Sequence, residues 1–249
     1  YYIGGVVGKS EYYSGRIGNV NVDVVINQSS TYSVESVGGI AGNSEERIIN
    51  SSATGKINVS GSEVGGLIGN GENGKISNSN SSVNIYGTSE VGGLVGKNRY
   101  SEITESYSTG NVTGDEEIGG LVGIVDRDRG LIKNSYSTSK VTGNRSVGGL
   151  VGYNDGKIRR SYFVGNVTGD TYAGGLVGWS VGNVKGSFWN TQTSGLIESD
   201  GGTGLNTSEM KSYWNFADSY YFAPDEINYF GLKNNSERQI ILENETNIL

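Results

Sequence analysis

The chain has 249 residues, a formal net charge of −7, 42 glycines and one proline, and it contains neither cysteine nor histidine. An acidic chain without a basic stripe is a poor partner for nucleic acid, and a single proline excludes collagen. The missing cysteine and histidine exclude disulfides, thiolate metal sites and the commonest general base. We therefore expect no cofactor, no metal site and no catalytic residue. No apolar run approaches the roughly 20 residues of a membrane span, so we expect no membrane insertion.

A six-residue motif, Val91-Gly-Gly-Leu-Val-Gly96, recurs seven times along the chain. The first glycines of successive copies are 34, 27, 27, 27, 29 and 26 residues apart. A period in this range marks a stack of repeats, and the abundance of glycine and β-forming residues excludes a helical hairpin as the unit. The sequence therefore predicts a solenoid whose copies begin at Ile3, Val37, Val64, Val91, Ile118, Val147 and Ala173.

The segment after each glycine motif has the pattern of a strand. Because strand side chains alternate between faces, small residues such as Ser106 and Ser108 should face the interior, and Tyr107 and Thr109 should face solvent. The inward position of Ser108 becomes Phe163 and Trp189 in the last two copies, which predicts a wider interior there. The position of Ser106 is serine in every aligned copy: Ser51, Ser79, Ser106, Ser135, Ser161 and Ser187.

These patterns predict an all-β fold, a parallel β-helix of about seven coils with a C-terminal cap. The glycine motif should form a strand that is either buried on both faces or kinked at its Gly-Gly pair, and glycine there allows opposite walls to approach closely. Pairing within one coil as a hairpin is the alternative topology. We expect a solenoid over residues 1–199 and a cap or assembly segment over 200–249, with a short helix begun by Asn206 or Thr207.

Three groups of residues are candidates for interaction sites. Glu63, Glu90 and Glu117 stack at equivalent positions, either as a solvated face or as a carboxylate cluster. The segment Arg238, Gln239, Ile240, Ile241 and Leu242 is a strand that could add to the edge of a neighbouring chain. An outward aromatic column either stabilises the sheet or stacks sugar rings, and it consists of Tyr107, Tyr136, Tyr162 and Phe188.

Asn-x-Ser/Thr sequons are frequent, and they indicate either glycosylation of an exported protein or the chance product of a chain rich in these residues. In Asn111-Val-Thr113 the asparagine and threonine should point outward, as glycan attachment requires. The chain opens inside a repeat without a methionine, which indicates a processed chain or a part of a longer precursor. The candidate asparagines are Asn27, Asn50, Asn58, Asn80, Asn111, Asn144, Asn166, Asn206, Asn234 and Asn244.

The repeat resembles the GLUG motif. The likeness rests on Leu94-Val-Gly96 and its equivalents, and on the flanking Gly110-Asn-Val-Thr-Gly114 and Asn134-Ser-Tyr-Ser-Thr138, and it covers roughly residues 1 to 195. The resemblance implies a large secreted or surface-attached bacterial or archaeal protein, often an adhesin, whose repeats carry no catalytic residues. The first repeat is degenerate and the tail after Pro224 has no counterpart in the motif.

Three functions are compatible with these observations. The leading hypothesis is a non-enzymatic extracellular protein that forms or decorates a cell-surface assembly, including a filament, by self-association or with other surface proteins. The second is a carbohydrate-binding module that holds extracellular polysaccharide on the tyrosine column. The third is a polysaccharide-degrading β-helix enzyme, which ranks last because the charged residues scatter over turns.

Overall fold

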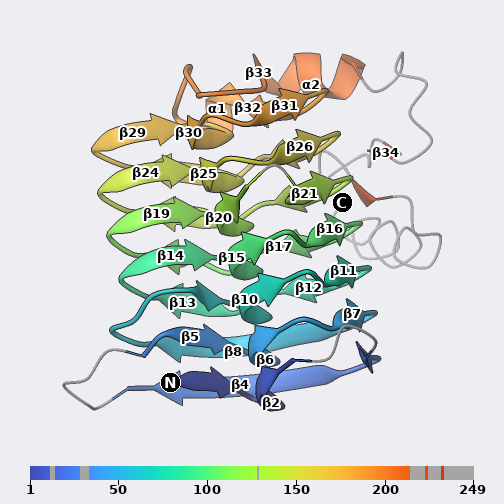
Figure 1. Ribbon diagram of the computed structural model, residues 1–249. Coiled ribbons are helices and arrows are strands. Elements are labelled where there is room, and N and C mark those ends of the chain that lie inside the picture. Colours follow the sequence, from blue (N-terminus) through green and yellow to red (C-terminus); the bar gives the residue numbers. More distant parts are fainter. Residues whose placement is uncertain (12–14, 29–33, 128, 214–221, 224–230, 233–249) are drawn as a thin grey trace, which may run out of the picture. The chain divides into compact units, whose positions relative to one another are not determined.

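The structure is a computed structural model that describes residues 1–11, 15–28, 34–127, 129–213, 222–223 and 231–232. It divides into two compact units, Tyr1–Gly204 and Leu205–Leu249. The first unit is a parallel β-solenoid, in which each coil adds strands to four sheets that we name A to D (Figure 1). All strand pairs described in these sheets join one coil to the next in parallel, as Val91 pairs with Val64 and Ile118, so the hairpin alternative is wrong.

The glycine motif forms two short strands in different sheets, so the kinked alternative is correct. Its first half lies in sheet A, of seven strands: β1 (Tyr2–Gly4), β5 (Ser36–Gly38), β9 (Val64–Gly65), β14 (Ser89–Gly92), β19 (Glu116–Gly119), β24 (Arg145–Gly148) and β29 (Thr171–Gly174). Its second half opens sheet B, also of seven strands: β2 (Val7–Ser10), β6 (Ala41–Ser44), β10 (Ile68–Glu72), β15 (Val95–Arg99), β20 (Val122–Asp126), β25 (Val151–Asn154) and β30 (Val177–Ser180).

Sheets A and B approach each other so closely that only glycine fits between them. A Cβ atom on Gly96 in β15 would lie 2.5 Å from the carbonyl carbon of Glu63 and 2.5 Å from the backbone nitrogen of Val64. No side chain tolerates such a contact with backbone atoms, so the expected close approach of walls is confirmed. The last glycine of the motif is therefore a packing requirement of the A–B corner.

The second segment of each repeat crosses to sheets C and D. Sheet C has seven strands: β3 (Arg16–Gly18), β7 (Arg47–Ile49), β11 (Lys75–Ser77), β16 (Glu102–Thr104), β21 (Leu131–Lys133), β26 (Lys157–Arg159) and β31 (Asn183–Lys185). Sheet D has twelve strands: β4 (Asn21–Asn27), β8 (Ser52–Asn58), β12 (Asn80–Ser81), β13 (Asn84–Tyr86), β17 (Tyr107–Ser108), β18 (Val112–Thr113), β22 (Tyr136–Ser137), β23 (Lys140–Thr142), β27 (Tyr162–Phe163), β28 (Asn166–Thr168), β32 (Phe188–Asn190) and β33 (Thr203–Leu205).

The interior holds the side chains that repeat from coil to coil. Val91, Leu94, Ile103 and Val112, one from each wall of a coil, are all 0% exposed, and their equivalents line the solenoid. In the last two coils Phe163 and Trp189 fill the space beside the second glycine of the motif, where their rings lie against Gly149 and Gly175. The large rings thus occupy room that the glycines leave.

Residues 191–204 cover the end of the last coil. Asn190 caps the short helix α1 (Thr191–Ser194) by accepting hydrogen bonds from Gln192 N and Thr193 N, and Gly195 ends it with φ 76°. The chain then crosses the coil, where Gly175 N donates to the Glu198 carbonyl at 2.9 Å. These contacts occupy backbone groups that another coil would otherwise pair with.

The second unit contains the helix α2 (Thr207–Tyr213) and the antiparallel strands β34 (Phe222–Ala223) and β35 (Gly231–Leu232). Asn206 begins α2, as expected. Its side chain accepts from Glu209 N at 2.9 Å, while Asn206 N donates to the Glu209 carboxylate at 2.8 Å. This reciprocal pair is a capping box.

Candidate functional site

In five of the seven repeats, the residue before the first apolar residue of the glycine motif turns the chain with a left-handed backbone. The φ angles are 50° at Glu63, 51° at Glu90, 59° at Glu117, 52° at Ser146 and 54° at Tyr172. Side chains other than glycine adopt this region rarely. The turn sends these side chains to the outside of the solenoid, because the next residue, such as Val64 or Val91, points into the core.

In three repeats the side chain at this corner position contacts the residue seven positions later, which lies on sheet B. Lys97 Nζ lies 3.2 Å from the Glu90 carboxylate, the rings of Tyr172 and Trp179 stack, and Lys9 Nζ lies 5.1 Å above the Tyr2 ring. We call this line of paired positions the seam. Its corner column is Tyr2, Ser36, Glu63, Glu90, Glu117, Ser146 and Tyr172, and its sheet B column is Lys9, Asn43, Asn70, Lys97, Ile124, Tyr153 and Trp179.

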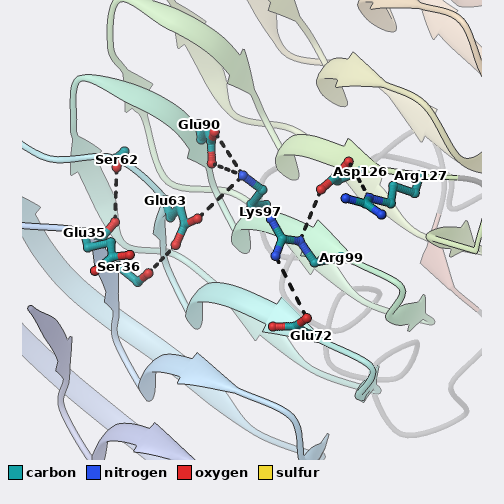
Figure 2. Close-up of polar contacts among 10 residues, drawn as sticks. All are labelled: Glu35, Ser36, Ser62, Glu63, Glu72, Glu90, Lys97, Arg99, Asp126 and Arg127. Carbon is teal, nitrogen blue, oxygen red and sulfur yellow. Dashed lines mark hydrogen bonds and ion pairs between the residues drawn. The ribbon is translucent and has the colours of Figure 1, made fainter.

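The middle of the seam is an ion-pair cluster (Figure 2). Lys97 Nζ lies 3.2 Å from Glu90 and 3.6 Å from Glu63, and the Ser36 hydroxyl donates to the other oxygen of Glu63. The side chains of Glu63 and Lys97 are each only 14% exposed. The expectation of a fully solvated carboxylate column is therefore wrong: these carboxylates are largely withdrawn from solvent, and two of them share one lysine.

Burial shifts the proton affinity of this cluster. It raises the pKa of Glu63 above its ordinary value of 4.5, while the Ser36 hydroxyl and Lys97 oppose that rise. Burial also raises the pKa of Glu117, with added repulsion from Glu90 and Glu116. Both directions follow from withdrawing a carboxylate from water and placing like charges beside it.

A second line of charges runs along the end of sheet B. Arg99 lies between Asp126, at 3.2 Å, and Glu72, at 4.0 Å, and so it joins three successive coils. Beside it, Arg127 donates to the Tyr100 hydroxyl at 2.8 Å. A shallow hollow of about 570 Å³ is lined by Tyr100, Arg127, Arg129 and Asp155.

The chemistry of these charges is structural. Among the described residues no cluster of three or more Asp or Glu is arranged to hold a metal ion. In the seam, Lys97 bridges the carboxylates of Glu63 and Glu90. Bridging ion pairs of this kind neutralise charge between coils.

The seam changes chemistry at its C-terminal end, where three aromatic rings replace the charges. Tyr172 and Trp179 stack with centroids 5.4 Å apart and an angle of 21°, and Tyr153 meets Trp179 edge-on at 5.5 Å and 81°. Tyr172 is 53% exposed and Trp179 is 38% exposed. Sequence reasoning missed this cluster, because its members are nineteen and seven residues apart and become neighbours only through the coil.

Four stretches of the chain match the GLUG motif: residues 33–58, 87–113, 114–142 and 143–168. The chain carries GLUG repeats. Each matched stretch contains one glycine motif and the segment that follows it into sheet D. The resemblance stated from the residues alone is thereby confirmed, and the repeated glycines of the motif lie at the A–B corner described above.

A solved structure shares the fold of these GLUG repeats. The crystal structure of a "putative immunoglobulin A1 protease" from Bacteroides ovatus superposes with a TM-score of 0.58, over 88% of this chain and 86% of that chain, at 16% sequence identity. At this identity the likeness concerns the fold alone. No curated protein sequence matches the chain. Among the described residues, no helix is long and apolar enough to cross a membrane.

The tyrosine column on sheet D of the GLUG repeats is a stacked ladder. The Tyr107 and Tyr136 rings lie 4.9 Å apart at 7°, and those of Tyr136 and Tyr162 lie 4.9 Å apart at 1°. Tyr162 is only 1% exposed and Phe188 only 6%. The expectation of a uniformly exposed column is wrong for these two rings, and the stacked faces favour the interpretation as a sheet-stabilising ladder.

The sequons of the GLUG repeats lie mostly on the surface. Asn80 and Asn206 are half-buried, and Asn206 is engaged in the cap of α2. Asn234 and Asn244 lie outside the described residues, as does the expected assembly strand 238–242. Glycosylation therefore stays a prediction, with six exposed candidates: Asn27, Asn50, Asn58, Asn111, Asn144 and Asn166.

The repeated serine of the GLUG repeats has a role beyond its small size. Ser79 N donates to the Ser106 hydroxyl oxygen of the next coil at 3.2 Å, and the Ser106 hydroxyl donates to the Thr104 carbonyl at 2.7 Å. The same two bonds recur at Ser51, Ser79, Ser135 and Ser161. Invariance of serine, where alanine or glycine would also fit a cramped interior, is the signal that could have revealed this ladder.

Proposed function

We propose that the solenoid is a non-catalytic structural segment of a secreted or cell-surface protein, and that it holds its outer faces in a fixed array for adhesion. The observation that carries this proposal is that the interior residues repeat from coil to coil, whereas the paired residues of the seam change. The residues that repeat, such as Val91, Leu94 and Ser106, are fully buried. The paired residues of the seam instead change along the stack, from Glu90 and Lys97 to Tyr172 and Trp179, as expected of a scaffold whose surface is free to vary.

Two further features support an extracellular, non-enzymatic role. The GLUG repeats and the exposed sequons agree with an exported chain. Glu63, Glu90 and Lys97 in the middle of the seam are mutually paired and largely buried, whereas a general acid or base needs access to a substrate. Because residues 195–204 already occupy backbone groups of the last coil, adhesion through the side walls is favoured over end-to-end growth through this end.

Negative-stain electron microscopy of cell-derived material beside the purified chain tests this proposal. Isolated short rods in both samples are expected if the side walls present binding surfaces. Regular filaments in the cell-derived material would show that assembly between copies is the main role. Steady hydrolysis of protein or polysaccharide substrates by the purified chain would overturn the non-catalytic assignment.

A further inference from the structure

The aromatic end of the seam differs from the other aromatic groups of the solenoid. In the sheet D ladder, the rings stack continuously from Tyr107 to the buried Tyr162. At the seam, Tyr172 and Trp179 remain 53% and 38% exposed although they belong to the last coil. Exposed clusters of large aromatic side chains commonly mark binding sites.

We propose that Tyr153, Tyr172 and Trp179 form a binding site for the pyranose rings of a neutral extracellular polysaccharide. The ring pair Tyr172–Trp179 is close to parallel, at 21°, and Tyr153 braces Trp179 from the side at 81°. The braced pair gives a rigid apolar surface. The negative face of an aromatic ring attracts the weakly positive C–H groups of a sugar.

The left-handed corner does not require an aromatic ring at Tyr172. Tyr172 has φ 54°, and the same corner occurs with φ 50° to 59° at Glu63, Glu90, Glu117 and Ser146, so the turn belongs to the repeat. A bulky side chain occupies this region only at a cost in free energy. Among these five corners the aromatic ring is particular to the last coil, where it stacks on Trp179.

Exposed polar side chains lie beside the rings. Thr171 precedes Tyr172 and lies in register with Arg145 of the preceding coil, and both residues are exposed. Ser180, which follows Trp179, instead accepts a hydrogen bond from Asn154, which is 0% exposed, and so lies on the other face of sheet B. An aromatic surface bordered by a few polar groups is the usual composition of a site that orients a polar ligand.

The charge around the rings is mixed and offers no positive patch to an anionic polymer. Burial raises the pKa of Tyr153, and Asp155, Asp126 and Glu117 raise it further through their negative charge. Asp126 is itself paired with Arg99 and Arg127, and Arg145 lies in register with Thr171. Such surroundings give a uronate or sulfated polysaccharide no net attraction, and they suit an uncharged hexose polymer.

The test measures binding of neutral glucan, mannan and galactan, with polygalacturonate as the anionic comparison, by isothermal titration calorimetry on the purified full chain. We expect one or more neutral polymers to bind, and Trp179→Ala and Tyr172→Asn to weaken that binding by about tenfold or more. Tyr86→Ala is the matched control, because Tyr86 is 49% exposed but lies on sheet D. It should change affinity by less than about twofold.

Tyr172→Asn separates binding from folding. Asparagine tolerates the left-handed backbone better than tyrosine, so this variant should unfold at the same temperature as the native chain or higher. The proposal is overturned if no neutral polymer binds, if polygalacturonate binds equally well, or if both ring variants bind like the native chain. Capture of a protein through the same rings, without any polysaccharide binding, would also overturn it. The site does not depend on the proposed structural role, and filaments in the microscope leave it unaffected.

Discussion

At the scale of single residues, a repeated buried serine joins successive coils by hydrogen bonds. The hydroxyl of Ser106 accepts from the backbone of one coil and donates within its own coil, and both bonds are buried. Sequence alone placed this serine in the interior correctly, because the alternation of strand side chains is a local property. It could not show the bonds, since the donor of Ser79 comes from a repeat 27 residues away.

Replacement of Ser106 by alanine should lower the free energy of unfolding by about 1–3 kcal/mol, because it leaves the buried Ser79 N–H without its acceptor. Urea unfolding followed by circular dichroism measures the change. Thr109→Ala, on the exposed side of the same segment, should stay within about 0.5 kcal/mol of the native chain. Equal stability of the two variants would contradict the ladder.

Glu117 combines a left-handed backbone with a raised pKa. Because the folded chain binds this proton more tightly than the unfolded chain, the free energy of unfolding should rise as the pH falls through the folded pKa towards 4.5. Glu117→Asn should therefore stabilise the chain at pH 7, by about 1 kcal/mol from the backbone alone. The gain should shrink at lower pH, as measured by urea unfolding across this range.

Glu105→Asn provides the comparison for that experiment. Glu105 has φ 51° in a different corner of the coil, away from the seam. Its replacement should give the backbone gain of about 1 kcal/mol at pH 7. A Glu117→Asn variant that is less stable than the native chain at pH 7 would show that its carboxylate contributes an attractive contact.

At the scale of elements, the glycine motif folds as two strands with a sharp corner. The sequence left open whether its apolar residues formed one buried strand or a kinked one, because Val91, Leu94 and Val95 are apolar in either case. The structure places all three inside at 0% exposure by turning the chain between them. The seam exists because of this corner, which brings a residue next to the one seven positions later. A spacing of seven does not occur in the two-residue periodicity of a simple strand, so the sequence pattern did not reveal it.

Deletion of one complete coil tests the equivalence of these elements. Removing residues 91–117 joins Glu90 directly to Ile118. The register should be kept, because Glu90 and Glu117 occupy equivalent corners and Val91 pairs with Ile118 in the native chain. The shortened chain should keep its β circular dichroism and lose about 4.8 Å of length in small-angle X-ray scattering.

Removing residues 91–104 instead joins a sheet A corner to a sheet C corner. Every following residue would then lie on the wrong wall, so this variant should aggregate or remain unfolded. Correct folding of the half-coil deletion would show that the coil is not the unit of the structure.

At the scale of the whole molecule, the constant interior and the variable exterior explain what could be predicted. Stacking, parallel pairing and the inward residues follow from repetition, and these were visible in the sequence. The aromatic end of the seam, the sharing of Lys97 by two glutamates and the burial of Tyr162 each depend on how unlike residues of different coils meet. Such contacts occur once and leave no period.

The hydrogen bonds of sheets A to D join each coil to the next, so in the solenoid unit they run along the direction in which the coils stack. A pull on the two ends of this unit would therefore oppose the bonds of one boundary coil at a time, while the others stay unloaded. Each released coil of 27 residues frees about 90 Å of extended chain. Under tension the solenoid would therefore unfold one coil at a time and lengthen in near-equal steps at modest force.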